Sequence, residues 1–259
     1  MFAVNGEKID MAESMRKGIY ILPNLFTTGS LFAGFYGIVA TTDGDFHSAA
    51  IWILISSIFD GLDGKVARMT GTSTKFGVEY DSLADLVAFG VAPGILMYSW
   101  ALKPFGRLGW LAAFLFVVCG ALRLARFNVQ VNTVESKRFV GLPIPAAASM
   151  VSATVLLFHR FGWPGSFKKL AILILIYSLA FLMVSSFRYY SFKDPELIKR
   201  QPFAVLVLAI LLLIVIAAEP VVMLFVIFLL YVLSGPIGFL MSYPRRRRLE
   251  KALRKDSPA

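Results

Sequence analysis

Four aspartates lie in or beside two apolar stretches of this 259-residue chain: Asp60 and Asp63 in the first, and Asp81 and Asp85 in the second. An ionised carboxylate costs roughly 2.5 to 3.5 kcal/mol at the centre of a membrane-spanning helix, so a cluster of them needs compensation. Arg68 alone cannot neutralise four acids at low dielectric, whereas divalent cations can. Ligation by oxygen alone suits magnesium, manganese or calcium, and magnesium commonly completes its shell with substrate phosphates. The aspartates therefore predict a divalent-metal site for phosphate chemistry.

Small residues accompany these aspartates at helical spacing. The first helix presents Asp60, Asp63, Gly64 and Ala67 on one face, and the second presents Gly77, Asp81 and Asp85. Short side chains at these positions allow a bulky ligand to approach the acids closely. The alternative is structural, with helix capping by Asp81 or pairing of the first two acids with Lys65 or Arg68. That alternative explains one aspartate at a time, but not two per helix on a shared face.

The elements that carry these residues are membrane-spanning helices. Apolar residues make up 58% of the chain and its mean hydropathy is +0.72, which is outside the range of soluble domains. We expect an all-α fold, a polytopic membrane bundle with about eight spans, or seven, because the last two meet at Glu219-Pro220. The predicted spans are Pro23–Thr41, Ser48–Met69, Ser82–Leu102, Gly109–Phe127, Pro143–Phe161, Leu170–Phe187, Phe203–Ala218 and Val221–Tyr243.

Basic residues are distributed unevenly among the connections. With a cytoplasmic N-terminus, 21 of the 26 Lys and Arg residues fall on the inner side and five on the outer side. This positive-inside pattern predicts an integral protein of the cell (inner) membrane, with both termini and the aspartates facing the cytoplasm. Topology and anionic lipid headgroups also explain the net charge of +10, so we expect membrane lipids rather than nucleic acid as partners.

Four segments follow from this pattern. Residues 1–20 form a cytoplasmic N-terminal amphipathic segment, 21–195 the membrane domain, 196–243 an additional transmembrane hairpin, and 244–259 a basic cytoplasmic tail. The first segment lacks the apolar core of a cleavable signal peptide. The membrane domain carries all four aspartates, so we expect the chemistry there and assign none to the last two segments.

The aspartates belong to a longer motif. It reads Asp60-Gly-Leu-Asp63-Gly-Lys-Val-Ala-Arg68, eight further residues, and Gly77-Val-Glu-Tyr-Asp81-Ser-Leu-Ala-Asp85. This motif resembles the signature of the CDP-alcohol phosphatidyltransferases at every defined position. The resemblance implies an enzyme with a six-helix membrane core plus two extra C-terminal helices and a CDP-activated lipid substrate. It also implies two divalent metals, Mg2+ or Mn2+, that bridge the substrate diphosphate, and a homodimer.

The resemblance assigns a role to each motif position. Asp60, Asp63 and Asp81 ligate metal, and Asp85 lies near the second metal and acts as general base. The nucleotide is implied to contact Gly64, Ala67, Arg68, Thr74 and Gly77, with Arg68 reaching phosphate. Pro23-Asn24-Leu-Phe-Thr27 resembles the short motif of the family that meets the cytidine, with Asn24 and Thr27 as contacts. The alternative for Asn24 is that it caps a helix.

Three further segments resemble the phosphatidylserine synthase branch of this family: Leu122–Asn128, Phe139–Ala147 and Tyr190–Lys193. The reaction implied is transfer of the phosphatidyl group from CDP-diacylglycerol to the hydroxyl of L-serine, which gives phosphatidylserine and CMP. Arg123 or Arg126 is our candidate for binding the serine carboxylate, because arginine forms a bidentate pair. Both also fit the positive-inside pattern without any such role.

Two alternatives stay open on the sequence. One is the same chemistry with another acceptor, glycerol phosphate or inositol phosphate, which would need a denser basic pocket. The other is a cation transporter whose intramembrane aspartates relay ions. A transporter predicts carboxylates near the bilayer midplane and paired broken helices in two halves of the chain, and the sequence shows neither pattern.

Overall fold

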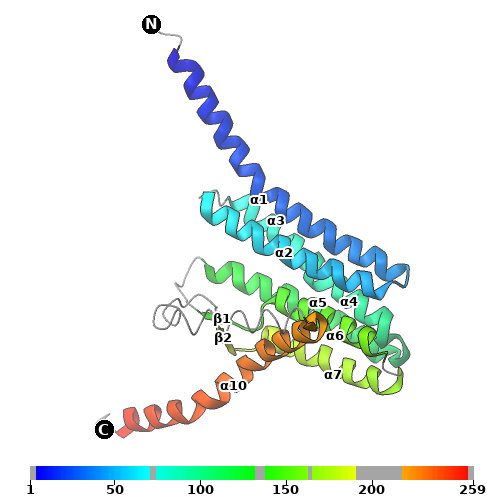
Figure 1. The fold of residues 1–259 in the computed structure, drawn as a ribbon. Coiled ribbons are helices and arrows are strands. Elements are labelled where there is room, and N and C mark those ends of the chain that lie inside the picture. Colours follow the sequence, from blue (N-terminus) through cyan, green and yellow to red (C-terminus); the bar gives the residue numbers. More distant parts are fainter. Residues whose placement is uncertain (1–3, 71–73, 132–137, 163–164, 191–217, 256–259) are drawn as a thin grey trace.

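The computed structural model describes residues 4–70, 74–131, 138–162, 165–190 and 218–255. It confirms an all-α membrane bundle, to which one pair of short strands is added (Figure 1). In chain order the elements are α1 (Val4–Thr42), α2 (Phe46–Thr70), α3 (Lys75–Asp85), the π-helix η1 (Leu86–Val91), α4 (Ala92–Met97), the π-helix η2 (Tyr98–Leu102), the 3-10 turn η3 (Lys103–Phe105), α5 (Arg107–Val131), β1 (Arg138–Val140), α6 (Ile144–Phe161), α7 (Gly165–Val184), β2 (Arg188–Tyr190) and α10 (Pro220–Lys255).

Most of the described helices can cross a membrane. Five stretches are long and apolar enough: Leu22–Thr42, Lys75–Phe105, Arg107–Val129, Ile144–Phe161 and Pro220–Leu240. α7 supplies a shorter apolar helix, and α2 is long enough with 25 residues but carries Asp60 and Asp63. The predicted span Phe203–Ala218 lies outside the described residues except for Ala218. The chain is thus a multi-pass membrane protein, as the sequence predicts.

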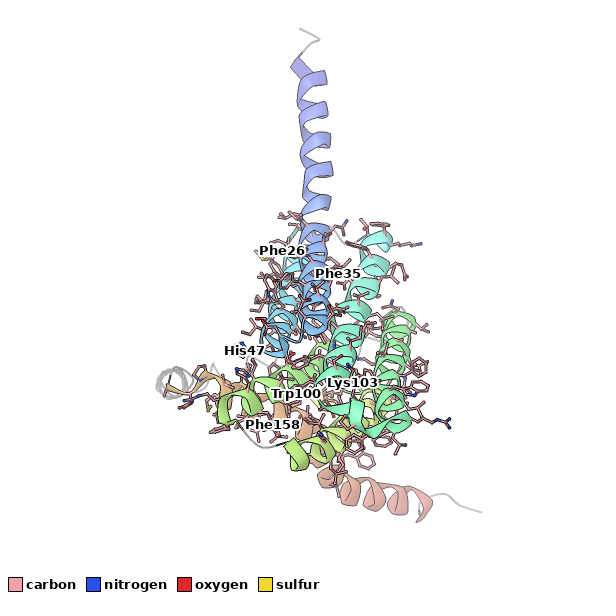
Figure 2. The ribbon with its side chains drawn as sticks, turned by 90° about the vertical axis from the view of Figure 1, so that its right-hand side faces the viewer. Phe26, Phe35, His47, Trp100, Lys103 and Phe158 are labelled. Carbon is pink, nitrogen blue, oxygen red and sulfur yellow. The ribbon has the colours of Figure 1, made fainter. Side chains whose placement is uncertain are left out.

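The bundle has two distinct ends. At the site end, α2 finishes at Thr70, α3 begins at Lys75, and the strand pair lies nearby (Figure 1). At the distal end, α1 gives way to α2, and Figure 2 shows His47, Trp100, Lys103 and Phe158 toward this end. Trp100 packs edge-to-face on Phe158, with ring centres 5.8 Å apart. The four aspartates belong to the parts of α2 and α3 that lie toward the site end.

α1 is one continuous helix, and its first half projects beyond the bundle (Figure 1). Pro23 lies inside it, where the missing N–H and the ring favour a bend. The expected amphipathic segment therefore joins the first span without a break from Val4 onward, rather than forming a separate helix. α10 likewise continues to Lys255, past the predicted end of the last span at Tyr243. The boundaries of the four segments stay predictions.

The third membrane crossing contains two π-helical turns. The first, η1, begins directly after Asp85, and Pro93 follows two residues beyond its end. Proline has no N–H for the carbonyl of Phe89 four residues earlier, so one α-helical hydrogen bond is missing at this point, as is common where a helix departs from regular geometry. The wider turn brings Ala88 and Phe89 into the core, while Asp81 and Asp85 keep the α-helical register of α3.

Close packing joins α1 to its neighbours. A Cβ on Gly34 would lie 2.5 Å from the Ala88 Cα, so α1 and η1 meet backbone to backbone. Ser30 of α1 and Ser56 of α2 are buried and hydrogen-bonded at 2.8 Å. Small residues and such hydrogen bonds drive helix association in a membrane. α1, α2 and the third crossing therefore form one packed unit that holds the aspartates.

The sequence does not predict the two-stranded antiparallel sheet. Its register places Arg138, Phe139 and Val140 of β1 opposite Tyr190, Tyr189 and Arg188 of β2, respectively. Gly141 follows β1 with a φ of +82°, and a Cβ there would overlap the Met183 carbonyl oxygen, so only glycine fits. The Gly141 N–H donates to the Phe187 carbonyl at 2.8 Å. The sheet thus ties the start of α6 to the end of α7.

Candidate active site

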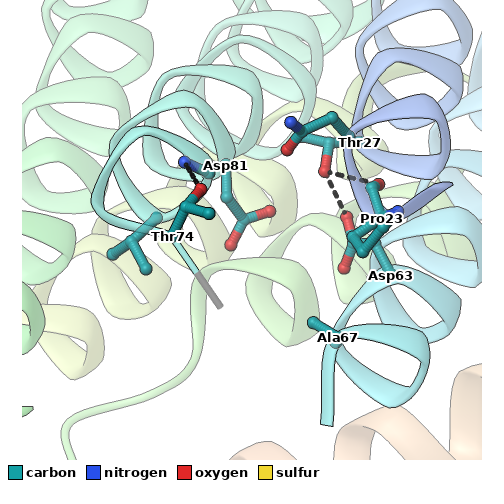
Figure 3. A pocket seen from close by; sticks show the side chains of 10 residues that line it. Pro23, Thr27, Asp63, Ala67, Thr74 and Asp81 are labelled. Atoms are coloured by element: carbon teal, nitrogen blue, oxygen red, sulfur yellow. Dashed lines mark hydrogen bonds between the residues drawn. The ribbon is translucent and has the colours of Figure 1, made fainter. Parts of the chain in front are cut away.

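A pocket opens at the site end between α1, α2 and the start of α3 (Figure 3). Its volume is about 430 Å3 including the open mouth. It is lined by Pro23, Asn24, Thr27, Asp63, Gly64, Ala67, Thr74, Gly77, Val78 and Asp81. Six of these are residues that the resemblance assigns to the nucleotide, and two are predicted metal ligands. The structure therefore brings residues of three consecutive helices together around one space.

Thr27 orients one of the aspartates. Its hydroxyl lies 2.9 Å from Asp63 Oδ2 and 3.2 Å from the Pro23 carbonyl oxygen, and can donate to either. Both Thr27 and Asp63 are buried. Carboxylates that bind metals are commonly held by such a hydrogen bond from a neighbouring group. Thr27 therefore positions Asp63 as well as lining the pocket.

The opposite wall joins α1 to α3. Thr74 is the N-cap of α3, and the Gly77 N–H donates to its hydroxyl oxygen at 3.0 Å. A Cβ on Gly77 would lie 3.3 Å from Asn24 Oδ1, so these two residues face each other. Asn24 lies far inside α1 and Asp81 lies in the interior of α3, so neither caps a helix. Both capping alternatives are therefore wrong.

Among the described side chains, no Lys or Arg forms an ion pair with the four aspartates, so Lys65 does not account for them, whereas pairing with Arg68 stays untested. The ion pair found among the described side chains joins Arg160 to Glu219, at 3.6 Å. Lys65 is exposed. The side chain of Arg68 lies outside the described part of the structure, so its contact with phosphate stays a prediction.

The aspartates converge from two helices. One carboxylate oxygen each from Asp60, Asp63 and Asp81 lies within 4.8 Å of the others. Asp60 also interacts with Asp85, and Asp63 interacts with Asp81. Figure 3 shows Asp63 and Asp81 directed from α2 and α3 toward the same space. The predicted metal ligands are thus adjacent, with Asp85 buried against Asp60.

This arrangement fits a divalent cation. Ionised carboxylates at contact distance repel one another strongly when buried, and a cation between them removes that repulsion. Asp81 Oδ1 is buried without a hydrogen-bond partner in the described structure, whereas buried polar atoms normally have one. Oxygen ligands from several carboxylates suit Mg2+, Mn2+ or Ca2+. The role of each aspartate toward the metal stays a prediction.

The structure separates the two arginines of α5. Arg123 is buried, and its Nε atom has no hydrogen-bond partner among the described residues. It interacts electrostatically with Asp60 and Asp85. Arg126 is exposed and donates through Nη1 to the Val184 carbonyl at the end of α7, at 3.3 Å. Arg123 is therefore the arginine on the aspartate side of α5.

Two further contributors to the site are not evident from the sequence. Asn128 Nδ2 donates to Ser82 Oγ at 2.9 Å, which joins α5 to the motif part of α3. Tyr231 of α10 interacts electrostatically with Arg123. Asn128 lies in a segment of the branch motif, but nothing in its spacing indicates its partner. Tyr231 lies in an apolar span and carries no local signal.

Comparison with known proteins identifies the family. The model of the CDP-alcohol phosphatidyltransferase family matches residues 20–184, which include the pocket, the four aspartates and both arginines. The chain belongs to this family. It is therefore an enzyme of the class that transfers phosphatidyl groups to alcohols with divalent metal, and its aspartate cluster can hold such an ion.

Curated relatives of this phosphatidyltransferase are similar over most of its length. It is 42% identical to CDP-diacylglycerol–serine O-phosphatidyltransferase of Helicobacter pylori over 223 residues. These aligned residues cover 86% of this chain and 92% of the relative. The protein of the same name from Bacillus subtilis is 34% identical over 172 residues, 66% of this chain and 91% of the relative. Archaetidylserine synthase of Methanothermobacter thermautotrophicus is 40% identical over 170 residues, 65% of this chain and 69% of the relative. All three names refer to serine.

Proposed function

We propose that this enzyme transfers the phosphatidyl group from CDP-diacylglycerol to the hydroxyl of L-serine, which yields phosphatidylserine and CMP. The observation that carries the proposal is the junction of two oppositely charged regions, a pocket lined by aspartates and, beside the aspartates, the buried Arg123. The first region suits a metal-bound diphosphate, and the second suits an acceptor that carries a carboxylate. The names of the relatives agree with this pair of substrates.

The donor side of the site comprises the pocket and the aspartate cluster. Seven residues are assigned to the cytidine nucleotide: Asn24, Thr27, Gly64, Ala67, Arg68, Thr74 and Gly77. A Cβ on Gly64 would meet no atom within 4 Å, so this face of α2 is open to a ligand. Asp60, Asp63 and Asp81 would hold Mg2+ or Mn2+, two ions per site, and Asp85 would lie near the second. When bound, the metal supplies positive charge that stabilises the phosphoryl oxygens.

Asp85 is the general base in this proposal. Its carboxylate takes the proton of the serine hydroxyl as that oxygen forms a bond to the lipid-side phosphorus. The bond from this phosphorus to the CMP oxygen breaks, and CMP leaves with the electron pair. The position of Asp85 supports the role, because it is buried against Asp60 and lies within electrostatic reach of Arg123. The transfer needs no covalent enzyme intermediate.

Arg123 binds the serine carboxylate on the acceptor side. A guanidinium forms two parallel hydrogen bonds to a carboxylate, and the Nε of Arg123, which has no partner among the described residues, is available for one of them. Arg126 is engaged with Val184, so we do not assign it to serine. Glycerol phosphate or inositol phosphate carries more negative charge than serine and would need more cations. Among the described side chains, Arg123 is the cation that interacts with Asp60 and Asp85, which favours serine.

The positions of Asp81 and Asp85 do not support a cation transporter. Asp81 and Asp85 fall within the first 11 residues of the 31-residue crossing Lys75–Phe105, near one end rather than midway. We also propose that the site end faces the cytoplasm from the inner membrane, because positively charged connections gather there. There the nucleotide and serine are available. The homodimer implied by the family resemblance belongs to the same proposal.

Product identification tests the proposed function. The purified full-length protein in detergent micelles receives CDP-diacylglycerol, Mg2+ or Mn2+, and either L-serine, glycerol phosphate or inositol phosphate. We expect CMP release with serine, a lipid product with the mass of phosphatidylserine, and loss of both after addition of EDTA. A product formed preferentially from a phosphorylated alcohol would contradict the choice of acceptor.

A further inference from the structure

Two adjacent threonines tie α1 to both helices that carry the aspartates. The hydroxyl of Thr27 lies 2.9 Å from the carboxylate of Asp63 on α2, as Figure 3 shows. The hydroxyl of the next residue, Thr28, lies 3.0 Å from that of Tyr80 on α3. Tyr80 directly precedes the predicted metal ligand Asp81. The contact of Thr28 with Tyr80 is therefore the counterpart, on α3, of the contact that orients Asp63 on α2.

The direction of the hydrogen bond between Thr28 and Tyr80 follows from a second contact. The Thr28 hydroxyl donates to the Asn24 carbonyl oxygen at 2.7 Å. A hydroxyl has one hydrogen to donate and can still accept, so Tyr80 is the donor to Thr28. Two hydrogen bonds in series therefore run from the Tyr80 side chain through Thr28 to the backbone of Asn24. We call Asn24, Thr28 and Tyr80 the Tyr80 tether.

The Tyr80 tether ends at the donor pocket. Asn24 lines this pocket, whereas Thr28 and Tyr80 lie outside its lining. A Cβ on Gly77 of α3 would lie 3.3 Å from Asn24 Oδ1, so α1 and α3 approach each other closely at this wall. Tyr80 follows Gly77 by three residues and shares a side of α3 with it. The tether therefore joins α1 to α3 directly beside the place where these two helices form the pocket.

Two features of the surrounding chain make this contact effective. Pro23 lies inside α1 directly before Asn24, and a helix bends easily where a proline removes a backbone hydrogen bond. The direction of α1 at the pocket therefore depends on contacts such as the tether. On α3, the ring of Phe76 lies one helical turn before that of Tyr80, with ring centres 6.0 Å apart and planes inclined by 11°. This stacking restricts the orientation of the Tyr80 ring.

We propose that Tyr80 is a positioning residue of the donor side, which holds α1 against α3 at the spacing that the cytidine nucleotide requires. It acts through Thr28 on Asn24 rather than by contact with the substrate. Without the tether, α1 and α3 separate more easily at the pocket, and the nucleotide binds less tightly. The inference rests on the proposed function, because it takes Asn24 and Gly77 as nucleotide contacts. It gives a role to Tyr80, to which the aspartate motif assigns none.

Separate kinetic constants for the two substrates test the role of Tyr80. Tyr80→Phe keeps the ring beside Phe76 and removes the hydroxyl. We expect KM for CDP-diacylglycerol to rise about threefold to tenfold, as for loss of one hydrogen bond, and kcat and KM for serine to stay within about twofold of wild type. Tyr177→Phe is the matched control, because its hydroxyl also joins two helices, through the Leu108 carbonyl at 3.5 Å. It should change none of these constants.

Variants of Thr28 test whether Tyr80 acts through the tether. Thr28→Val removes the hydroxyl at nearly constant volume and should raise KM for CDP-diacylglycerol by the same factor as Tyr80→Phe, whereas Thr28→Ser should keep the wild-type value. Both substitutions break the same series of hydrogen bonds, so the double variant should be no worse than either single variant. Thr42→Val is the control, because it removes a hydroxyl that donates to the Val39 carbonyl at the distal end of α1, at 2.7 Å.

Titration of the full-length protein with CDP in the presence of Mg2+ gives a measurement that is independent of turnover. The Kd for CDP should rise in Tyr80→Phe by the same factor as KM for CDP-diacylglycerol. An unchanged Kd, or an equal rise of KM for both substrates, would overturn the role of Tyr80 while phosphatidylserine formation by the wild type still supports the proposed function. Wild-type enzyme that forms no phosphatidylserine would overturn the proposed function, whereas a raised Kd in Tyr80→Phe would still support the tether.

Discussion

The donor and acceptor sides of the site differ in how the chain builds them. The donor pocket uses residues 23–81 of three consecutive helices. The acceptor side brings together Asp85 of α3 and Arg123 of α5, which interact electrostatically. Local features such as helical spacing and the Thr74 cap are enough to arrange the first. The second exists only after distant elements have packed, so we expect the choice of alcohol to depend on parts of the fold that lie outside the signature motif.

The two sides also differ in the charge that they present. Carboxylates on the donor side require cations, whereas the buried guanidinium on the acceptor side requires an anion. A substitution on one side should therefore change the KM for one substrate and spare the other. Variants that change both KM values equally would contradict this division.

Asp81→Asn should have the largest effect. It removes a charge from the aspartate cluster, so we expect the rate of CMP release to fall about 1,000-fold at saturating substrates. Asp43→Asn, an exposed position at the distal end, is the control and should keep the wild-type rate. A loss of less than about tenfold would show that Asp81 is not part of the metal site.

Arg123→Lys should have the second-largest effect. It keeps the charge but loses the bidentate geometry, so KM for serine should rise about 10-fold to 100-fold while KM for CDP-diacylglycerol changes little. Arg126→Lys is the matched variant one helical turn further along α5 and should change KM for serine less than about threefold. Equal effects of the two substitutions would argue that serine is bound by neither arginine alone.

Gly64→Ala tests the donor side. A methyl group on Gly64 projects into the pocket and meets no existing atom, so the fold tolerates it, and KM for CDP-diacylglycerol should rise about tenfold. Gly61→Ala is the control, because its added Cβ also meets nothing within 4 Å but lies on an exposed face of α2 away from the pocket. Steady-state kinetics with each substrate varied in turn would distinguish the Gly64→Ala variant from the Gly61→Ala control. A larger change in KM for serine would reverse the assignment of the two sides.

Asp45→Ala should have the smallest effect on activity. Asp45 accepts from the Ser48 N–H at 3.0 Å at the start of α2, and its hydrogen bonds to the Ser48 side chain and backbone lower the pKa of Asp45. This stabilisation is present above the pKa of the unfolded chain and is lost as pH falls through the folded pKa. The Tm should therefore be lower in the variant at neutral pH and converge with wild type in acid, with both KM values unchanged. A changed KM would link the distal end to the site.

The donor side follows from the sequence because Asp60, Asp63 and Gly64 obey the helical period, and Gly77 and Asp81 repeat it on the next helix. The acceptor side does not. Arg123 and Arg126 are equivalent in sequence, and only the position of Val184 at the end of α7 shows which one is engaged elsewhere. The hydrogen bond from Tyr189 to the Val232 carbonyl likewise joins β2 to α10 across 43 residues, with no local signal in the sequence.

Helix continuity was the other feature that local sequence did not determine. Pro23 suggests the start of a helix and makes Asn24 a plausible cap, yet α1 passes through both. A proline within a helix is tolerated where the chain bends, and the pattern of apolar residues does not distinguish a bend from a break. The π-helical turn after Asp85 also has no periodic signal of its own.

Labelled serine gives the most direct test of the central claim. Wild-type enzyme with CDP-diacylglycerol, Mg2+ and isotopically labelled L-serine should form labelled phosphatidylserine and CMP in equal amounts. Asp85→Asn should still bind CDP-diacylglycerol but form both products at about 1% of the wild-type rate or less, because the serine hydroxyl loses its base. Labelled lipid formed by Asp85→Asn at close to the wild-type rate, or CMP released by wild type without labelled lipid, would contradict the account.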